Sequence, residues 1–210
     1  MDTTKRKILS KYVDFIQHHK KPPKSIGSFM QELKMKESTF LRFFDSFKQL
    51  EKEYWRSTFE IVLQNIQRQE VYESYSVNEK LLAFYFAWIE EVKGYREFVK
   101  YTIKEERIYE LYPDSFELFK KDFEDYCEAL ISEGLATEEV AKRLYITDKY
   151  KYLLWYQPVS IIKFWSKDQS KDFEDTDALI EKTVNFSFDM MRSNGMDSLF
   201  DLAKFHIQHF

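Results

Sequence analysis

The stretch SIGSFMQELKMKESTFLRFFDSFKQL, from Ser25 to Leu50, decides what kind of protein this chain can be. Its apolar residues recur at three- and four-residue spacings on both sides of the polar joint KMK. This pattern predicts two short amphipathic helices connected by a tight turn. Ser25 and Ser46 stand where N-caps are expected, the first before the second helix of the chain and the other before a long fourth helix. The lysines at the joint and Arg42 in the second segment suggest a cationic outer surface.

Helical periodicity extends in both directions from this stretch. A first helix is expected from Thr3 to Lys20, and it must end there because Pro22 and Pro23 cannot continue a helix. The long fourth helix is expected to begin at Phe47 and to lead from a small head into a larger body. Expected helices after residue 46 cover residues 47–75, 76–92, 94–111, 114–134, 137–145, 148–168, 173–195 and 196–210.

Single residues mark the expected breaks between these helices. Gly94 is expected to form a C-cap and turn, and Gly134 is expected to close a helix that Pro113 opens. Thr137 stands at an N-cap position for the short segment after it. Pro158 lacks the amide hydrogen that an unbroken helix needs, so it is expected to kink its helix or to free a carbonyl.

The composition favours an all-α fold. Among 210 residues there are only four glycines and four prolines, whereas 44% are hydrophobic and 18% aromatic. An all-β fold would need more turn residues, and a disordered chain would have fewer aromatic residues. We therefore expect a three-helix head over residues 1–47 and a helical bundle body over residues 48–210.

The chain has neither an apolar run of about 20 residues, which would span a bilayer, nor a secretory signal pattern. A cytoplasmic protein without a membrane span is the expectation. Cys127 is the only cysteine, which excludes an intrachain disulfide and a thiolate metal cluster.

The charge is unevenly distributed. Residues 1–50 hold nine lysines and two arginines against three aspartates and two glutamates, a net charge of +6, which leaves −10 for the rest of a chain whose total is −4. A basic module on an acidic body is typical of a polyanion-binding head, because lysines gain affinity by releasing counterions from phosphates. The alternative is that the lysines only solvate helix ends.

From Ile8 to Phe44 the chain resembles the N-terminal domain of TetR-type repressors without a gap. SIGSF stands where the family has a Ser or Thr before its second helix, STFLRFF where it has Gly-Thr-Leu-Tyr-x-x-Phe, and DSFKQL where it has Ser-Lys-x-x-Leu. The resemblance implies a helix-turn-helix head on an all-helical ligand-binding body, working as a homodimer on double-stranded DNA. In the family, the third helix, here from Lys36 to Phe43, enters the major groove.

The resemblance also implies which residues touch DNA, by contacts to phosphates or base edges. These residues are Lys24, Ser25, Lys36, Glu37, Ser38, Thr39, Arg42 and Lys48. The chain departs from the family at five positions. It has Tyr12 and Met30 in place of small residues such as Ala, so the head must be packed differently. It also has Lys34 in place of a turn glycine, Leu41 in place of a phosphate-binding Tyr, and Phe47 in place of a Lys. Lys48 could substitute for the last of these. Two lost phosphate contacts would weaken DNA binding without abolishing it.

Aromatic residues at helical spacings in the body have two interpretations. They are either core residues or the lining of a pocket for a small hydrophobic ligand with a polar tip. The candidate lining comprises Phe84, Tyr85, Trp88, Tyr101, Trp155 and Tyr156. The last two large helices of a TetR-type body commonly form the dimer interface, and the candidates there are Ile161, Ile180, Val184 and Phe188.

The segment from Phe164 to Val184 is also similar to the lipid-binding relatives of this fold in ubiquinone biosynthesis. Its polar residues Asp168, Ser170, Asp172 and Thr176 are interpreted as helix caps. His206 and His209 lack a carboxylate or cysteine that would complete a metal site. No catalytic residue, cofactor or metal is expected. The sequence predicts a ligand-responsive DNA-binding regulator, and the alternative is a lipid- or isoprenoid-binding protein without DNA binding.

Overall fold

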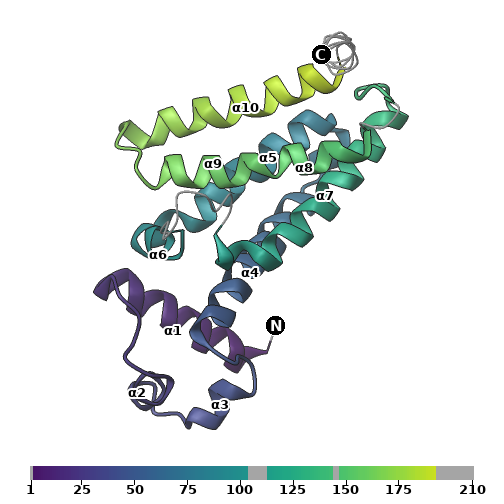
Figure 1. Cartoon of the computed structure of the whole chain (residues 1–210). Coiled ribbons are helices and arrows are strands. Elements are labelled where there is room, and N and C mark those ends of the chain that lie inside the picture. Colours follow the sequence, from purple (N-terminus) through teal and green to yellow (C-terminus); the bar gives the residue numbers. More distant parts are fainter. Residues whose placement is uncertain (1, 104–112, 144–146, 193–210) are drawn as a thin grey trace, which may run out of the picture.

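The computed structural model of the chain describes residues 2–103, 113–143 and 147–192 (Figure 1). Across these ranges the chain forms α-helices and short 3-10 segments without a strand, so the predicted all-α fold is confirmed. The helices are α1 (Thr3–His19), α2 (Ile26–Glu32), α3 (Glu37–Leu41), α4 (Phe47–Gln67), α5 (Val77–Val92), α6 (Arg96–Thr102), α7 (Glu117–Ala136), α8 (Tyr150–Leu154), α9 (Tyr156–Trp165) and α10 (Glu174–Arg192).

Three helices form the small head, α1 to α3, at the end of the molecule opposite α10 (Figure 1). The side chain of Asp2 caps α1 by accepting hydrogen bonds from the backbone amides of Thr4 (2.7 Å) and Lys5 (3.2 Å). Phe29 and Phe40, from α2 and α3, are buried with the apolar face of α1. The interior of the head is therefore aromatic rather than built from small residues.

The long helix α4 joins the head to the body. Its first turn belongs to the head, because the ring of Phe47 stacks on Tyr12 of α1 at 4.8 Å between centroids. One turn later, the Tyr12 hydroxyl donates a 2.6 Å hydrogen bond to the carboxylate of Glu51. The remainder of α4 packs against α5 and α7 in the body. The helix thus leads from the head into the body as the sequence predicts, within one continuous apolar core. It ends at Gln67, before the expected residue 75.

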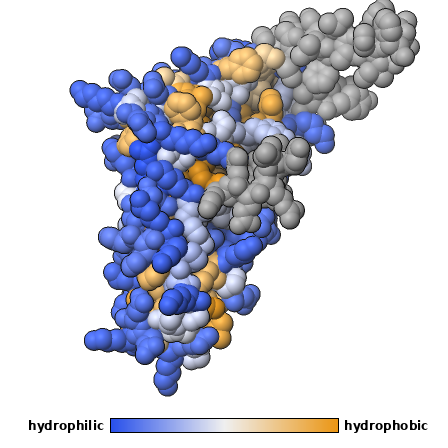
Figure 2. All heavy atoms as spheres, turned by 60° about the vertical axis from the view of Figure 1, so that its left-hand side comes forward, coloured by the Kyte–Doolittle hydropathy of each residue, from blue (hydrophilic) through white to orange (hydrophobic). Residues whose placement is uncertain are grey.

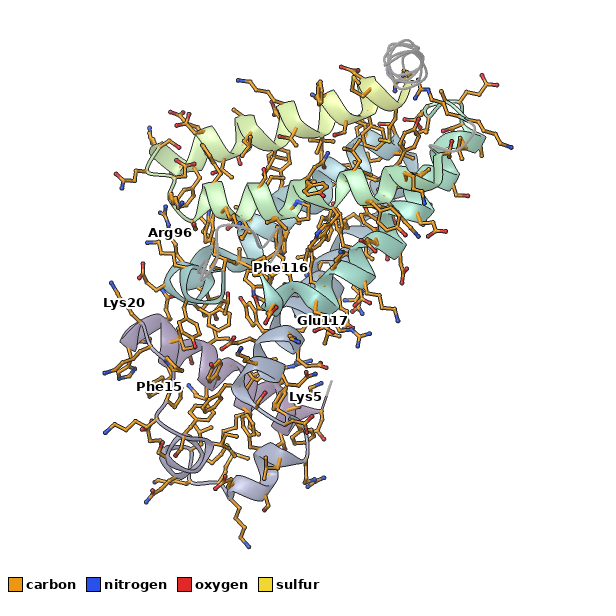
Figure 3. The ribbon with its side chains drawn as sticks, viewed as in Figure 1. Lys5, Phe15, Lys20, Arg96, Phe116 and Glu117 are labelled. Atoms are coloured by element: carbon orange, nitrogen blue, oxygen red, sulfur yellow. The ribbon has the colours of Figure 1, made fainter. Side chains whose placement is uncertain are left out.

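A second contact holds the head against the body. The side-chain oxygen of Gln17 in α1 accepts hydrogen bonds from the backbone amides of Glu97 (2.9 Å) and Phe98 (3.2 Å) at the start of α6. Lys20 at the end of α1 adds an ion pair with Glu97 at 3.5 Å. Figure 3 shows Lys20 of the head and Arg96 of α6 on the two sides of this junction. The head is therefore attached at α4 and at α6.

The body encloses an aromatic cluster between α4, α5 and α7. Trp55, Trp88 and Phe116 are fully buried, and their ring centroids lie 4.5 to 6.2 Å apart. Such offset and edge-on contacts are favourable beyond the burial of apolar area. Helices α9 and α10 cover α5 on the side away from α4 (Figure 1).

The predicted break at Pro158 is present. Helix α8 ends at Leu154 and α9 begins at Tyr156, because Pro158 has no amide hydrogen to donate to the Leu154 carbonyl. The predicted cap role of Asp168 is also confirmed. Its carboxylate accepts hydrogen bonds from the amides of Ser170 (2.8 Å) and Thr176 (3.0 Å) and from the Thr176 hydroxyl (2.5 Å). This cap sets the turn between α9 and α10.

Four expectations about breaks are wrong in whole or in part. Gly94 lies in the 3-10 segment that separates α5 from α6, so the expected turn is present, but the C-cap of α5 is Lys93. Gly134 does not close α7, which continues to Ala136. It is needed instead for close packing, since a Cβ there would lie 2.7 Å from Val140 Cγ2. Residues 137–143 are not helical, so Thr137 caps no helix. The third helix is shorter than expected and ends at Leu41.

The helix expected over residues 196–210, with His206 and His209, lies outside the described residues.

Asp168 generates a prediction about stability at low pH. Burial opposes ionisation of this carboxyl group, but the hydrogen bonds from Thr176 and Ser170 outweigh burial and lower its pKa from 3.8 to about 2. Its contribution to folding is therefore complete above pH 3.8 and is lost as the pH falls towards about 2. Asp168→Asn should lower the free energy of unfolding by about 1–2 kcal/mol at neutral pH.

Urea titrations of both proteins at a series of pH values would measure this difference. The exposed Asp125 on α7 provides a matched control, and Asp125→Asn should change stability little at any pH. A deficit of Asp168→Asn that stays constant through the acidic range would contradict the proposed role of the ionised cap.

Candidate nucleic-acid interface and ligand sites

The head presents α2, the following turn and α3 on the side away from the body (Figure 1). Ser25 begins α2 with a capping box, in which its hydroxyl accepts from the Ser28 amide (3.1 Å) and the Ser28 hydroxyl accepts from the Ser25 amide (3.2 Å). Lys36 is the N-cap residue of α3 and makes no capping hydrogen bond with its side chain. Both helix starts therefore face solvent.

Seven of the eight residues predicted to touch DNA are exposed, and Thr39 is half-buried. The four cations among them, Lys24, Lys36, Arg42 and Lys48, form no ion pair with any carboxylate of the described residues. Other lysines of the head are paired, namely Lys5 with Glu53, Lys11 with Asp14, and Lys20 with Glu97. The four cations on the outer face thus remain available to an anion, whereas Lys5 and Lys20 neutralise acids on α4 and α6.

Two details of the turn differ from an ideal interface. Lys34 adopts a φ of 55°, the left-handed region that favours glycine, which is the residue the family has at this position. The carboxylate of Glu37 folds back over α2, where a Cβ added to Gly27 would lie 3.0 Å from Glu37 Oε2. Glu37 is therefore next to α2 instead of projecting freely from the start of α3.

The predicted pocket lining is mostly core. Phe84, Tyr85 and Trp88 are completely buried, and Trp155 is 3% exposed. Trp88 stacks with Phe84 and contacts Phe119 at 5.0 Å between centroids, so the rings fill the space that a ligand would occupy. Tyr101 is half-buried, and Tyr156 is 50% exposed. The six residues do not surround one cavity.

Two polar features lie in this core. The hydroxyl of Tyr85 donates to Gln157 Oε1 (3.2 Å), and Gln157 Nε2 donates to the Ser187 hydroxyl (2.6 Å), which links α5, α9 and α10. The indole N–H of Trp88 is buried and finds no acceptor among the described residues. An unsatisfied buried donor is costly, so Trp88 is a position where a ligand with an acceptor atom would be stabilised.

The predicted dimer residues are placed differently from the expectation. Ile161, Ile180, Val184 and Phe188 are 0 to 2% exposed, because they form the inner faces of α9 and α10 that pack within the chain. Within a single chain these four side chains therefore belong to the core. The i, i+4 spacing of residues 180, 184 and 188 identified the apolar face correctly but not what covers it.

The outer face of α8, α9 and α10 carries apolar residues that the sequence reasoning missed, except for Tyr156, which it assigned to the pocket lining. Most of the large exposed apolar side chains in the described residues lie there, namely Tyr152, Leu153, Tyr156, Phe164 and Phe186. Phe186, at 65% exposure, lies off the buried stripe by two residues, which is the signal that could have identified it. Leu153, Tyr156, Phe186 and Met190 line a groove of about 350 Å³ between the end of α8, the start of α9 and α10. Figure 2 shows apolar patches at the height of α9 and α10 on a largely hydrophilic surface.

Comparison with known proteins decides the family. Residues 80–206 match the family model described as "Tetracyclin repressor-like, C-terminal domain", which covers more than half of the chain. This chain belongs to the TetR-like family. None of the curated proteins matches it significantly.

Two solved structures share the TetR-like fold across nearly the whole chain. One is a protein of unknown function from Rhodococcus sp. RHA1, with a TM-score of 0.59 and 12% identity, covering 92% of this chain and 97% of that one. The other is from Shewanella sp. PV-4 and was proposed to be a TetR family transcription regulator. It has a TM-score of 0.52 and 15% identity, covering 87% of this chain and 98% of that one.

The TetR-type assignment is thus confirmed. The family model matches residues 80–206, and the resemblance noted in the sequence covers a separate segment, Ile8–Phe44. Within the described helices, none is both long enough and apolar enough to cross a membrane. The assignments of individual residues to DNA, ligand and dimer contacts stay predictions.

The strained turn of the head generates a stability prediction. A lysine with a φ of 55° is less favourable than glycine there, so Lys34→Gly should raise the free energy of unfolding by about 0.5–1 kcal/mol. The same change at Lys48, in the first turn of α4, should lower it by a similar amount because glycine is unfavourable inside a helix. Chemical denaturation would measure both. Destabilisation by Lys34→Gly would show that the lysine side chain stabilises the turn in some other way.

Proposed function

We propose that this chain is a DNA-binding transcriptional regulator that acts as a homodimer and responds to a small hydrophobic ligand. The observation that carries the proposal is the distribution of charge on the head. Lys24, Lys36, Arg42 and Lys48 are exposed and lack ion-pair partners among the described residues, on the face where TetR-type proteins bind DNA. Their helix starts also supply backbone amides that suit phosphates.

The dimer uses the outer faces of α8, α9 and α10 in this proposal. Exposed apolar side chains there, including Tyr156 and Phe186, would be buried by a second copy. A two-fold axis between the bodies would present two heads to two half-sites of a duplex. The inner residues predicted from the sequence, Ile161 among them, would then support the interface from behind instead of forming it.

Signals between body and head would pass through the two junctions described above. A ligand that displaced rings near Trp88 would move α5 and α7 relative to α4 and change the spacing of the heads. The buried indole N–H of Trp88 would be satisfied by the polar end of such a ligand. Movement of α6 would act on α1 directly, because Gln17 bonds the first amides of α6.

The alternative is a lipid- or isoprenoid-binding protein of the same fold that does not bind DNA. Leu41, 52% exposed where TetR-type proteins often have a phosphate-binding Tyr, favours this alternative. The two functions differ in whether the cations of the head contribute to binding a duplex.

A salt titration distinguishes them. The chain should bind a short duplex of mixed sequence, with an affinity that falls steeply as salt rises, because counterions are released from phosphates. Lys36→Ala and Arg42→Ala should each weaken binding and reduce the slope of log K against log salt by about one. Fluorescence anisotropy of a labelled duplex would measure these slopes.

Lys121→Ala is the matched control, because this lysine is exposed on α7 of the body. Its binding curve should coincide with that of the unmodified chain. If the chain does not bind the duplex, or if all four proteins have the same slope, the regulator proposal fails and the lipid-binding alternative is favoured.

The dimer proposal has its own test. Phe186→Asp places a charge in the centre of the proposed interface and should convert the dimer to a monomer in sedimentation at micromolar concentration. The fold should survive, since Phe186 is 65% exposed in a single chain. Val71→Asp, at a residue 48% exposed between α4 and α5, should leave the dimer intact. A dimer unaffected by Phe186→Asp would place the interface on another surface.

A further inference from the structure

A cavity of about 250 Å³ lies where the head meets the body, apart from the aromatic cluster and the outer groove. Its walls come from α1 of the head, from the middle of α4, and from the C-terminal end of α5 with the residues just after it. Leu9, Val13 and Ile61 supply an apolar wall. The cavity is smaller than the roughly 300–1,000 Å³ of pockets for drug-sized ligands, so its occupant must be small.

Tyr54 in this cavity is the exception among the buried tyrosines of the described residues. Tyr12, Tyr72, Tyr85, Tyr126 and Tyr150 all use their hydroxyls in hydrogen bonds. Tyr54 is only 6% exposed, yet its hydroxyl has no hydrogen-bond partner in the described part of the chain. Burial raises the pKa of this phenol, and the neighbouring Tyr95 and Glu91 raise it further. Tyr54 lines the cavity, and a largely buried side chain whose hydroxyl forms no hydrogen bond within the described chain is available to a ligand there.

Glu91 gives the cavity its charge. It is an exposed residue on the lining of the cavity, and its partial burial raises the pKa of its carboxyl group. Among the described residues it forms no ion pair, whereas the adjacent Glu90 pairs with Lys93 at 3.3 Å. Glu60 also lines the cavity, but its carboxylate is paired with Arg56 at 3.3 Å. Arg6 is the one cation that lines the cavity, and it forms no ion pair with either acid.

We propose that this cavity binds a small amine with an apolar body, whose ammonium group pairs with Glu91 and hydrogen-bonds to the Tyr54 hydroxyl. The apolar part lies against Leu9, Val13 and Ile61, and the ring of Tyr95 adds a face that attracts a cation. An anionic ligand is disfavoured beside the carboxylate of Glu91, which forms no ion pair among the described residues and repels a like charge. The proposal commits to positive charge on the ligand and to a size close to one ring with a short chain.

The position of the cavity between head and body means that a ligand in it would affect how the head is oriented. Since its walls belong to α1 in the head and to α4 and α5 in the body, an occupant would hold the head in its present orientation. Any effect of this fixed orientation on DNA binding rests on the function proposed above. Binding of the amine to the cavity does not depend on that function.

Calorimetry with the full chain tests the binding step, with phenethylamine as the probe and its neutral and anionic analogues, phenethyl alcohol and hydrocinnamate, as comparisons. Phenethylamine should bind, and both analogues should bind at least about tenfold more weakly. Glu91→Gln should weaken amine binding by about tenfold, since it removes the charge and preserves the shape. Tyr54→Phe should weaken it by a smaller factor, as one hydrogen bond is lost.

Glu90→Gln is the control on the same helix, because Glu90 does not line the cavity, and it should bind phenethylamine like the unmodified chain. The inference is overturned if phenethylamine does not bind, if the neutral alcohol binds equally well, or if Glu91→Gln binds normally. A duplex titration with and without the amine separates the two proposals. Amine binding to a chain that never binds DNA would leave the site standing and remove the regulator function.

Discussion

The hydrogen bond between Tyr12 and Glu51 is the interaction on which the arrangement of head and body depends. Glu51 is only 9% exposed, and a carboxyl group so buried needs a partner to offset the loss of water. Burial raises its pKa, while the bond from the Tyr12 hydroxyl lowers it. Because Tyr12 belongs to α1 and Glu51 to α4, satisfying this group sets the angle at which the head leaves the long helix. The stacking of Tyr12 on Phe47 then supplies the apolar part of the same joint.

Local signals in the sequence were sufficient for much of the fold. Ser25 and Ser46 begin the helices that they were expected to begin, and Asp168 caps the α9–α10 turn, because these side chains bond amides that are close in the sequence, at most eight residues away. Gly134 shows where such reasoning ends. A glycine near a helix end looks like a terminator, but here it is needed by contacts with Val140 and Val77, which no local pattern contains.

The candidate sites were harder to predict, for a physical reason. Periodicity identifies an apolar face, and it does not tell whether that face packs within the chain, contacts a second copy or surrounds a ligand. Ile180 and Phe188 were assigned to a dimer but lie in the core, while Phe186, which breaks the pattern, is exposed. By contrast, the exposure of Lys36 and Arg42 could be anticipated, since a charge without a partner must stay in water.

The two candidate ligand sites differ in the free energy needed to create space for a ligand. Opening the cluster around Trp88 would separate rings that contact one another on several sides, and each lost contact must be replaced by the ligand. A ligand there must therefore be large and apolar enough to restore the packing, and it gains in addition the unsatisfied indole N–H. The cavity beside Tyr54 already exists and needs no such displacement, so a small molecule can occupy it at little structural cost. On the two proposals made above, a bulky apolar molecule would act by rearranging the body, and a small cation by holding the junction between α1, α4 and α5 in place.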